Sequence, residues 1–365
     1  MIERFMRLND VLARVTGLRL VRDSQLESIG FYRQRRAMND ANREAAAILD
    51  VMAHHNRRPL SPFLKSRADE YARDVLGSLD YAPWLYVYAA YQGTFREGWM
   101  PDNFYHLRVV PEVGNAISRV TGNKSFTSLV LKTESLPDLA YRIGGNFYDR
   151  DFAVIDRDAL ARLAADFSHV FVKEDGSGGG VAVQKIVAKA IADHEFQGDC
   201  VVQRPIRQHP LFDALSPQSV ATLRITTARD PAGAFSVRGA FLRLGRAGRD
   251  CVVAAEAFDV IVKGADGALD ELGYDGEWRA LAAHPDTGAP LSGLVVPHFR
   301  RVLEFCLSLH AKVPHVSVVG WDVAITSDDG IALIEWNGGH CDIKFCETVT
   351  GPHYSDMGWE RFKGV

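Results

Sequence analysis

A chain of 365 residues is long enough for two or three domains, and its 47% hydrophobic and 24% charged residues are typical of a soluble globular protein. The net charge of −4 argues against a nucleic-acid footprint over the whole chain, although it leaves room for a local basic patch. The five scattered cysteines contain no CxxC pair, and no apolar run is long enough to span a bilayer. We therefore expect a cytoplasmic protein with no transmembrane segment and no nucleic-acid partner.

The first third of the chain divides into a helical part and an aromatic part. Residues 1–80 have the apolar spacing of amphipathic helices, with arginines on the other faces. These arginines are interpreted as a solvated surface, with contact to an acidic partner as the alternative. Residues 81–115 are rich in tyrosine, tryptophan and phenylalanine, which favours core packing over a docking platform. Turn signals predict that this N-terminal region, 1–115, ends near residue 115.

A glycine-rich loop dominates the next region, 116–199. The elements expected here are a helix over 116–131 that contains Asn123 and Lys124, a strand over 152–155, a helix over 157–167, and strands over 169–174 and 181–186. A Walker loop or a dinucleotide fingerprint requires a helix after its glycines. The loop over 175–180 instead leads into a strand, so it is interpreted as the tip of a β-hairpin whose N–H groups can close over phosphates. Lys173, on the strand before the loop, strengthens that interpretation.

The third region, 200–350, is predicted to contain a sheet and one helix, and residues 351–365 are predicted to form a tail. Strands are expected over 200–206, 220–228, 235–244 and 257–262, followed by a loop-rich segment over 270–293 and a helix over 296–312. Pro205 is a natural hinge at the end of the first of these strands. Arg224 is a charged residue inside an otherwise apolar strand.

The region ends in a predicted hairpin over 318–337, with the turn Ser-Asp-Asp-Gly at residues 327–330. A four-residue loop places Thr326 opposite Ile331, and counting back places Asp322 opposite Glu335. Asn337 shares the face of Glu335, because side chains alternate along a strand. Facing carboxylates repel each other, so a hard cation such as Mg²⁺, which prefers oxygen ligands, is expected there. The alternative is a surface hairpin with a polar face.

Together, several segments resemble the ATP-grasp superfamily. They are Asn-Lys at 123–124, Val-Phe-Val-Lys at 170–173 with its glycine hairpin, Val-Val-Gln-Arg-Pro-Ile at 201–206, and Asp322 with a downstream Glu-Trp-Asn at 335–337. The segments Gln-Arg-Pro-Ile at 203–206, Leu-Arg-Ile-Thr-Thr at 223–227 and Gly-Trp-Asp at 320–322 resemble the sugar-transfer-associated branch. The resemblance covers about residues 116–350. It implies an α+β fold in which two subdomains, 116–199 and 200–350, clasp ATP.

The resemblance also implies a reaction and a set of ligand residues. ATP would phosphorylate a carboxylate, and an amine would then attack the acyl phosphate, in surface polysaccharide or secondary metabolite biosynthesis. The residues implied are Lys124 and Lys173 for the phosphates; Gly176, Ser177, Gly178 and Gly179 in the closing loop; Gln203, Arg204 and Ile206 for adenine; and Asp322, Glu335 and Asn337 for Mg²⁺. The partners would be small carboxylates and amines, including sugar-linked ones.

Two positions depart from the family pattern. Glu174 follows Lys173 where proline is usual, which predicts a less rigid entry to the loop. Many ligases of the superfamily have an arginine two residues before the first metal aspartate, where this chain has Gly320. Arg224 is the expected substitute in catalysis, with a structural salt bridge as its alternative role. The rival functions are an ATP-dependent kinase on the same fold and a non-catalytic nucleotide-binding module.

Overall fold

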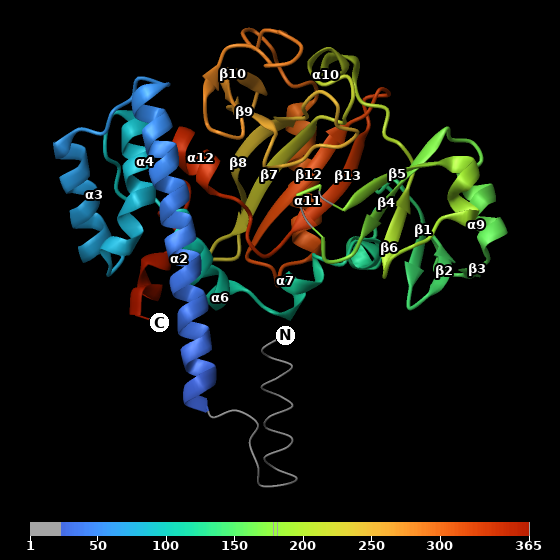
Figure 1. Ribbon diagram of the computed structural model, residues 1–365, viewed down its shortest axis with the longest axis horizontal. Coiled ribbons are helices and arrows are strands. Elements are labelled where there is room, and N and C mark those ends of the chain that lie inside the picture. The colour runs from blue at the N-terminus through green and yellow to red at the C-terminus, as the bar shows by residue number, and fades with distance from the viewer. Residues whose placement is uncertain (1–22, 178, 181, 365) are drawn as a thin grey trace.

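The computed structural model describes residues 23–177, 179–180 and 182–364, which form a helical N-terminal region and two sheets (Figure 1). One sheet has the strand order β3-β2-β1-β6-β4-β5, and the other has the order β11-β10-β9-β8-β7-β12-β13. Figure 1 shows the seven-stranded sheet in the centre, with the N-terminal helices on one side and the six-stranded sheet on the other. The predicted α+β class is confirmed.

Strands β1–β6 form the six-stranded sheet, and the later strands β7–β13 form the seven-stranded sheet. The helices and helical turns are α2 (Asp23–His54), α3 (Pro62–Asp74), η1 (Leu79–Tyr81), α4 (Ala82–Gln92), α5 (Asp102–Phe104), η2 (Tyr105–Val109), α6 (Val110–Val113), α7 (Ala116–Val120), η3 (Lys124–Phe126), α8 (Thr127–Leu131), α9 (Arg157–Ala164), η4 (Ala188–Asp193), α10 (Pro210–Leu215), α11 (Phe299–Lys312), α12 (Lys344–Val349) and η5 (Trp359–Gly364). The strands are β1 (Asp138–Ile143), β2 (Asn146–Asp149), β3 (Val154–Ile155), β4 (His169–Glu174), β5 (Val183–Val187), β6 (Cys200–Gln203), β7 (Thr222–Arg229), β8 (Phe235–Leu244), β9 (Phe258–Lys263), β10 (Ala268–Tyr274), β11 (Ala280–Leu281), β12 (Val318–Ile325) and β13 (Ile331–Asn337).

The six-stranded sheet packs on α9 and the short turn η4. Asp156 caps α9 by accepting a hydrogen bond from the N–H of Ala159 at 2.7 Å, which satisfies a free donor of the first turn. Leu160 and Ala164 of this helix are buried in a core with Val170 and Val172 of β4. β6 lies between β1 and β4, so the segment just after residue 200 belongs to this sheet.

The seven-stranded sheet is built around β7 and β12, which pair in antiparallel fashion. One face of this sheet packs on the apolar side of α11, where Val302 joins Trp321 and Trp336 in the largest core. The two tryptophans stack at 6.0 Å between ring centroids. Since side chains alternate along β12, Asp322 points to the opposite face, and that face carries the charged residues described below.

The aromatic N-terminal region shares its core with the end of the chain. Trp84 and Trp99, from the aromatic segment 81–115, are completely buried, so the expected core packing is confirmed. Trp359, close to the C-terminus, lies in the same core and stacks on Tyr354 at 5.2 Å between ring centroids. Figure 1 shows the C-terminal end beside α2. The predicted helical content of residues 1–22 lies outside the described residues.

Three expectations about elements are wrong. The helix predicted over 116–131 is interrupted, because α7 ends before Gly122 and Lys124 begins the separate turn η3. Residues 138–149 form the hairpin of β1 and β2, where the sequence predicted no strand. The segment 270–293 is not simply a loop, because β10 runs into it and pairs with β9 and β11. Acidic residues on the exposed side of β10 hide its strand character from sequence reasoning.

Among the helices of the described residues, none combines the length and the apolar content that a bilayer crossing requires.

The shared core predicts that the end of the chain stabilises the whole N-terminal region. Trp359 is only 2% exposed, so Trp359→Ala should lower the free energy of unfolding by about 3–5 kcal/mol, as for a large buried aromatic side chain. Phe63 on α3 is 71% exposed, and Phe63→Ala should change this free energy by less than about 0.5 kcal/mol. Denaturant unfolding followed by tryptophan fluorescence measures both, and equal small effects would contradict a shared core.

Candidate functional site

The hairpin of β12 and β13 brings two carboxylates face to face. Asp322 pairs with Glu335, as the sequence predicted, but the four-residue loop from which this pairing was counted is wrong. Ile325, not Thr326, pairs with Ile331, and an irregularity after Asp322 restores the expected pairing. The irregularity is the kind of β-bulge that re-aims side chains next to functional sites.

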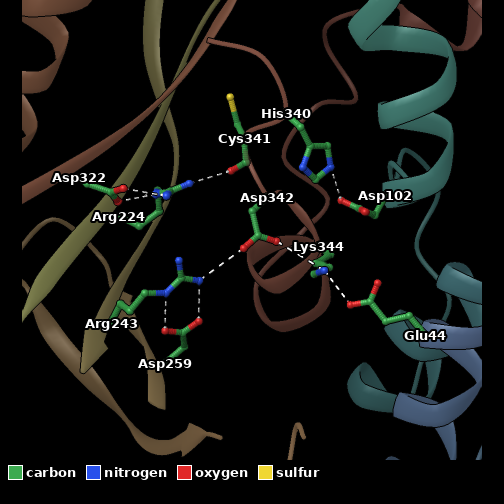
Figure 2. Close-up of polar contacts among 10 residues, drawn as sticks. All are labelled: Glu44, Asp102, Arg224, Arg243, Asp259, Asp322, His340, Cys341, Asp342 and Lys344. Atoms are coloured by element: carbon green, nitrogen blue, oxygen red, sulfur yellow. Dashed lines mark hydrogen bonds and ion pairs between the residues drawn. The ribbon is translucent and has the colours of Figure 1, made fainter. Parts of the chain in front are cut away.

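Arg224 holds the first of these carboxylates. Its position on β7 is directly opposite Asp322, and its Nε and Nη2 atoms donate to Asp322 Oδ1 and Oδ2 at 2.6 and 2.9 Å (Figure 2). Arg224 is only 8% exposed. Burial would lower the pKa of Arg224, but the charge and hydrogen bonds of Asp322 outweigh it and raise the pKa above its usual value. This arginine is therefore permanently charged.

Gly320 makes room for that guanidinium group. A Cβ atom at residue 320 would lie 3.2 Å from Nη1 of Arg224 and 3.5 Å from its Cδ atom. The side chain from the neighbouring strand thus occupies the space beside residue 320, the position where the superfamily pattern has an arginine of its own.

Glu335 is the carboxylate without a fixed partner. None of the described residues donates a hydrogen bond to it, and burial together with the charge of Asp322 raises its pKa. Lys173 on β4 lies across the cavity, where burial lowers the pKa of its ammonium group and the charge of Glu335 counteracts this effect. A cation next to Glu335 would favour the ionised form of this carboxylate, which burial and the charge of Asp322 disfavour.

Lys124 holds the glycine loop. Its Nζ atom donates to the carbonyl of Glu174 at 3.2 Å and to the Oγ atom of Ser177 at 3.3 Å, and also contacts the Ser177 carbonyl. The Oγ atom of Ser177 in turn donates to the Glu174 carbonyl at 2.6 Å. The carboxylate of Asp175 accepts from the N–H of Ser125 at 3.0 Å. The loop entry after Lys173 is therefore anchored by these contacts in the absence of the usual proline.

The predicted residues come together around one cavity between the two sheets. Those that line it are Lys124, Lys173, Ser177, Gly179, Gln203, Arg204, Ile206, Arg224, Asp322, Glu335 and Asn337. Gly176 is not among them, because its N–H donates to the carbonyl of Gly122 at 2.8 Å. Gly178 lies outside the described residues. The side chain of Gln203 donates to Asp138 at 2.7 Å, which fixes its orientation at the hinge.

The sequence reasoning missed three groups of cavity residues. They are the apolar walls Phe171, Val183, Val220 and Ile334; the segment Asp250, Cys251, Val252 and Ala254; and Arg243 of β8. Arg243, like Arg224, is a charged residue in a largely apolar strand, but β8 also contains Arg238, so the charge alone does not single out Arg243. The other two groups carry no chemical signature and become visible only through long-range packing.

The glycine hairpin and the segment 250–254 close the cavity from opposite sheets. The N–H of Ala254 donates to the carbonyl of Gly179 at 3.2 Å, and Lys185 on β5 forms an ion pair with Asp250 at 2.6 Å. At Gly180, a Cβ atom would lie 2.3 Å from the carbonyl oxygen of Val252. Only glycine permits this approach.

The charges of the cavity favour anionic ligands. Five basic and three acidic side chains line it, which leaves an excess of two positive charges; they are Lys124, Lys173, Arg204, Arg224 and Arg243 against Asp250, Asp322 and Glu335. The described residues contain no cluster of three or more histidine, cysteine, aspartate or glutamate side chains that could hold a metal ion. The oxygen atoms of Asp322, Glu335 and Asn337 nevertheless form a donor set that suits Mg²⁺, which binds through few protein ligands and substrate phosphates.

Residues 181–355 match the sequence profile of the family described as sugar-transfer associated ATP-grasp. No curated protein sequence matches the chain at a significant level. Similar solved structures include D-alanyl-alanine synthetase A from Vibrio cholerae, with 11% identity, a TM-score of 0.41, and coverage of 67% of this chain and 66% of that one. Biotin carboxylase from Campylobacter jejuni has 12% identity, a TM-score of 0.43, and coverage of 72% and 52%, respectively. N5-carboxyaminoimidazole ribonucleotide synthetase from Thermotoga maritima has 11% identity, a TM-score of 0.35, and coverage of 64% and 50%. The chain thus spans between half and two thirds of the length of these proteins.

The buried ion pair of Arg224 and Asp322 predicts strong coupling between them. Arg224→Met should lower the free energy of unfolding by about 3–5 kcal/mol, because it leaves the Asp322 carboxylate buried without a partner. In the double mutant with Asp322→Leu, the loss should be smaller than the sum of the single losses by at least about 1 kcal/mol. The exposed pair of Arg150 and Glu134 is the control, with an expected coupling below about 1 kcal/mol. Additive losses at the Arg224 pair in denaturant unfolding would contradict the structure.

Proposed function

We propose that the chain, which matches the sugar-transfer associated ATP-grasp family over residues 181–355, is a magnesium- and ATP-dependent carboxylate–amine ligase of ATP-grasp fold. The observation that carries the proposal is the positively charged cavity in which Lys124, Lys173 and Arg224 surround the carboxylates of Asp322 and Glu335. The nucleotide would lie between the six-stranded sheet, which includes β6, and the seven-stranded sheet.

In the proposed reaction, a carboxylate oxygen attacks the γ-phosphorus of ATP, the bond from that phosphorus to ADP breaks, and an acyl phosphate forms. An amine then attacks the acyl carbon and loses a proton. The carbon–oxygen bond to phosphate breaks, inorganic phosphate leaves, and a carbon–nitrogen bond remains. Catalysis of the first step rests on positioning and charge neutralisation, so no covalent protein group is required.

The adenine would bind at the hinge between the sheets. Gln203, Arg204 and Ile206 line the cavity there, and Phe171 and Val220 supply apolar walls. Aromatic and aliphatic walls suit a planar base, while the backbone of the hinge strand offers hydrogen bonds to its edge. The amide of Gln203 is already engaged by Asp138, which makes it a fixed wall rather than a free donor.

The phosphates would bind where the basic side chains and the glycine hairpin meet. Lys173 approaches Glu335 from the six-stranded sheet, and Lys124 reaches the glycine hairpin through Ser177. Asp322, Glu335 and Asn337 would hold Mg²⁺, which supplies positive charge to the phosphate oxygens when it is bound. Arg224, fixed by Asp322, would stabilise the charge that develops on the transferred phosphoryl group.

The glycine hairpin and the segment 250–254 would exclude water from this site. Their contact between Gly179 and Ala254 covers the cavity from both sheets. An acyl phosphate is readily hydrolysed, so a ligase needs such a cover until the amine arrives.

The substrates are proposed to be a small carboxylate and an amine, including sugar-linked ones. Surface polysaccharide or secondary metabolite biosynthesis in the cytoplasm is the proposed setting, in keeping with the family match. The described part of the N-terminal region, 23–115, would lie on the outer side of the acceptor site.

The first test of the proposal is binding of Mg–ADP and Mg–ATP, measured by calorimetric titration. Glu335→Ala should abolish ADP formation and weaken metal-dependent nucleotide binding about tenfold or more, because it removes a metal ligand. Lys173→Ala should raise the ATP requirement by a similar factor, because it removes a phosphate-binding charge. Glu271→Ala and Lys189→Ala change exposed residues of the same types and should leave both quantities unchanged. Near-normal turnover by folded Glu335→Ala would rule out the magnesium assignment.

A second test separates the ligase from a kinase on the same fold. Hydroxylamine added during turnover should capture the acyl phosphate as a hydroxamate, in amounts that match the ADP formed. A kinase that phosphorylates a hydroxyl group gives ADP without hydroxamate, so that result would favour the kinase. The absence of Mg–ATP binding to folded protein would favour a non-catalytic module.

A further inference from the structure

A second buried arginine lies beside Arg224 on the same face of the seven-stranded sheet. Arg243 of β8 pairs with Thr222 of β7, two residues before Arg224, so both arginines project from one face. Both line the cavity, and Arg243 is only 7% exposed. The burial of two like charges side by side is unfavourable unless a ligand or neighbouring acids compensate.

The two arginines are anchored in the same way. Arg243 donates from Nε and Nη2 to the carboxylate of Asp259 at 3.0 and 2.9 Å, just as Arg224 donates from its Nε and Nη2 to Asp322. Asp342 accepts a further, longer bond from Nη2 of Arg243 at 3.4 Å. One edge of each guanidinium group is therefore fixed by its own aspartate.

The other edge of each guanidinium group has fewer partners. No described residue accepts a hydrogen bond from Nη1 of Arg243, and Nη1 of Arg224 has only a long contact of 3.4 Å to the carbonyl of Cys341. Figure 2 shows Nη1 of Arg243 without a dashed line, pointing to the side on which Arg224 lies. Arg243 therefore presents an Nη1 group without a described acceptor at the cavity, and Nη1 of Arg224 is engaged there only by the long bond to the carbonyl of Cys341.

We propose that Arg224 and Arg243 together bind the carboxylate of the acceptor substrate through these Nη1 groups. The proposal rests on the proposed ligase function and names the part of the site that selects an anionic acceptor. Planar guanidinium groups match the planar carboxylate and bind it with directed, charge-assisted hydrogen bonds. A neutral hydroxyl acceptor would form weaker hydrogen bonds with these groups than an ionised carboxylate does.

The position of Arg243 fits the acceptor better than the γ-phosphate. The metal ligands lie on β12 and β13, Arg224 lies on β7, and Arg243 lies on β8, one strand farther out. With strands about 4.8 Å apart, Arg243 is about 10 Å from the strand of Asp322. A group at this distance from the metal ligands lies next to the phosphate and does not contact it. Arg224, between the two, can contact both the phosphoryl group and the acceptor.

The outer side of this arginine pair is connected to the N-terminal region. Lys344 lies 3.9 Å from Asp342 and donates to Glu44 of α2 at 2.8 Å, and His340 contacts Asp102 of α5 at 3.1 Å (Figure 2). The N-terminal helices α2 and α5 therefore contact the segment 340–344, which lies on the outer side of the arginine pair.

The test uses simple carboxylates as probes on the full-length protein. Acetate and malonate, with acetamide and malonamide as neutral controls, are titrated with and without saturating Mg–ADP and followed by thermal shift and calorimetry. Carboxylates alone should stabilise the wild type, and Arg243→Lys should weaken their binding at least tenfold while Mg–ADP affinity changes less than twofold. Arg246→Lys is the matched control, because Arg246 is also held by both oxygens of an aspartate, Asp286, and does not line the cavity.

A second variant guards against misfolding. Arg243→Met combined with Asp259→Leu replaces a buried ion pair by apolar side chains of similar size, a change that buried pairs often tolerate. It should lose carboxylate binding as Arg243→Lys does.

Three results would overturn the proposal. The first is unchanged carboxylate binding in both variants, and the second is no carboxylate-specific stabilisation of the wild type. The third is a larger loss of affinity in the Arg243 variants for a non-hydrolysable ATP analogue than for ADP, which would assign Arg243 to the γ-phosphate. If the wild type fails to bind Mg–ADP, the proposed function fails, and the titration without nucleotide still decides the role of the arginine pair.

Discussion

The pairing of Arg224 with Asp322 is the interaction on which the rest of the site depends. It joins β7 to β12 within the seven-stranded sheet, and it places a permanent positive charge beside two carboxylates that would otherwise repel each other. Buried ion pairs of this kind add little net stability compared with apolar packing. Their retention at the floor of a cavity therefore points to function, because charge placement is what an apolar pair could not provide.

The cavity floor and its cover respond to ligands through the same charges. Lys124 contacts the carbonyls of the glycine hairpin, so a phosphate that binds Lys124 competes with the contacts that hold Ser177. The hairpin also touches the opposite subdomain at Ala254. If a nucleotide binds as proposed, its entry would loosen this contact between the two sheets, and its phosphates would replace the lost hydrogen bonds with stronger, charge-assisted ones. Closure of the cavity would then be coupled to occupancy of the proposed phosphate site.

Local pattern predicted much of this arrangement, and long-range packing determined the remainder. The alternation of residues in β4, β8 and β12 was sufficient to place these strands, and the pairing of Asp322 with Glu335 followed from it even though a bulge offset an error in the loop. Arg243 was overlooked because its meaning depends on a neighbour 19 positions away, Arg224, which only the pairing of β7 with β8 brings close. The core shared by Trp84 and Trp359 was equally out of reach, since no periodicity links residues at opposite ends of a chain.

The charged face of the seven-stranded sheet gives a physical reason for the placement of the N-terminal helices. Arg224, Arg243, Asp259 and Asp322 form a row across β9, β8, β7 and β12, and a row of charges needs either water or polar partners above it. Asp342 and its contacts toward α2 and α5 supply those partners at one end, while the cavity leaves the other end open to ligands. Under the proposal above, the carboxylate of the acceptor would bind at this open part, beside the contacts that link the row to the N-terminal helices.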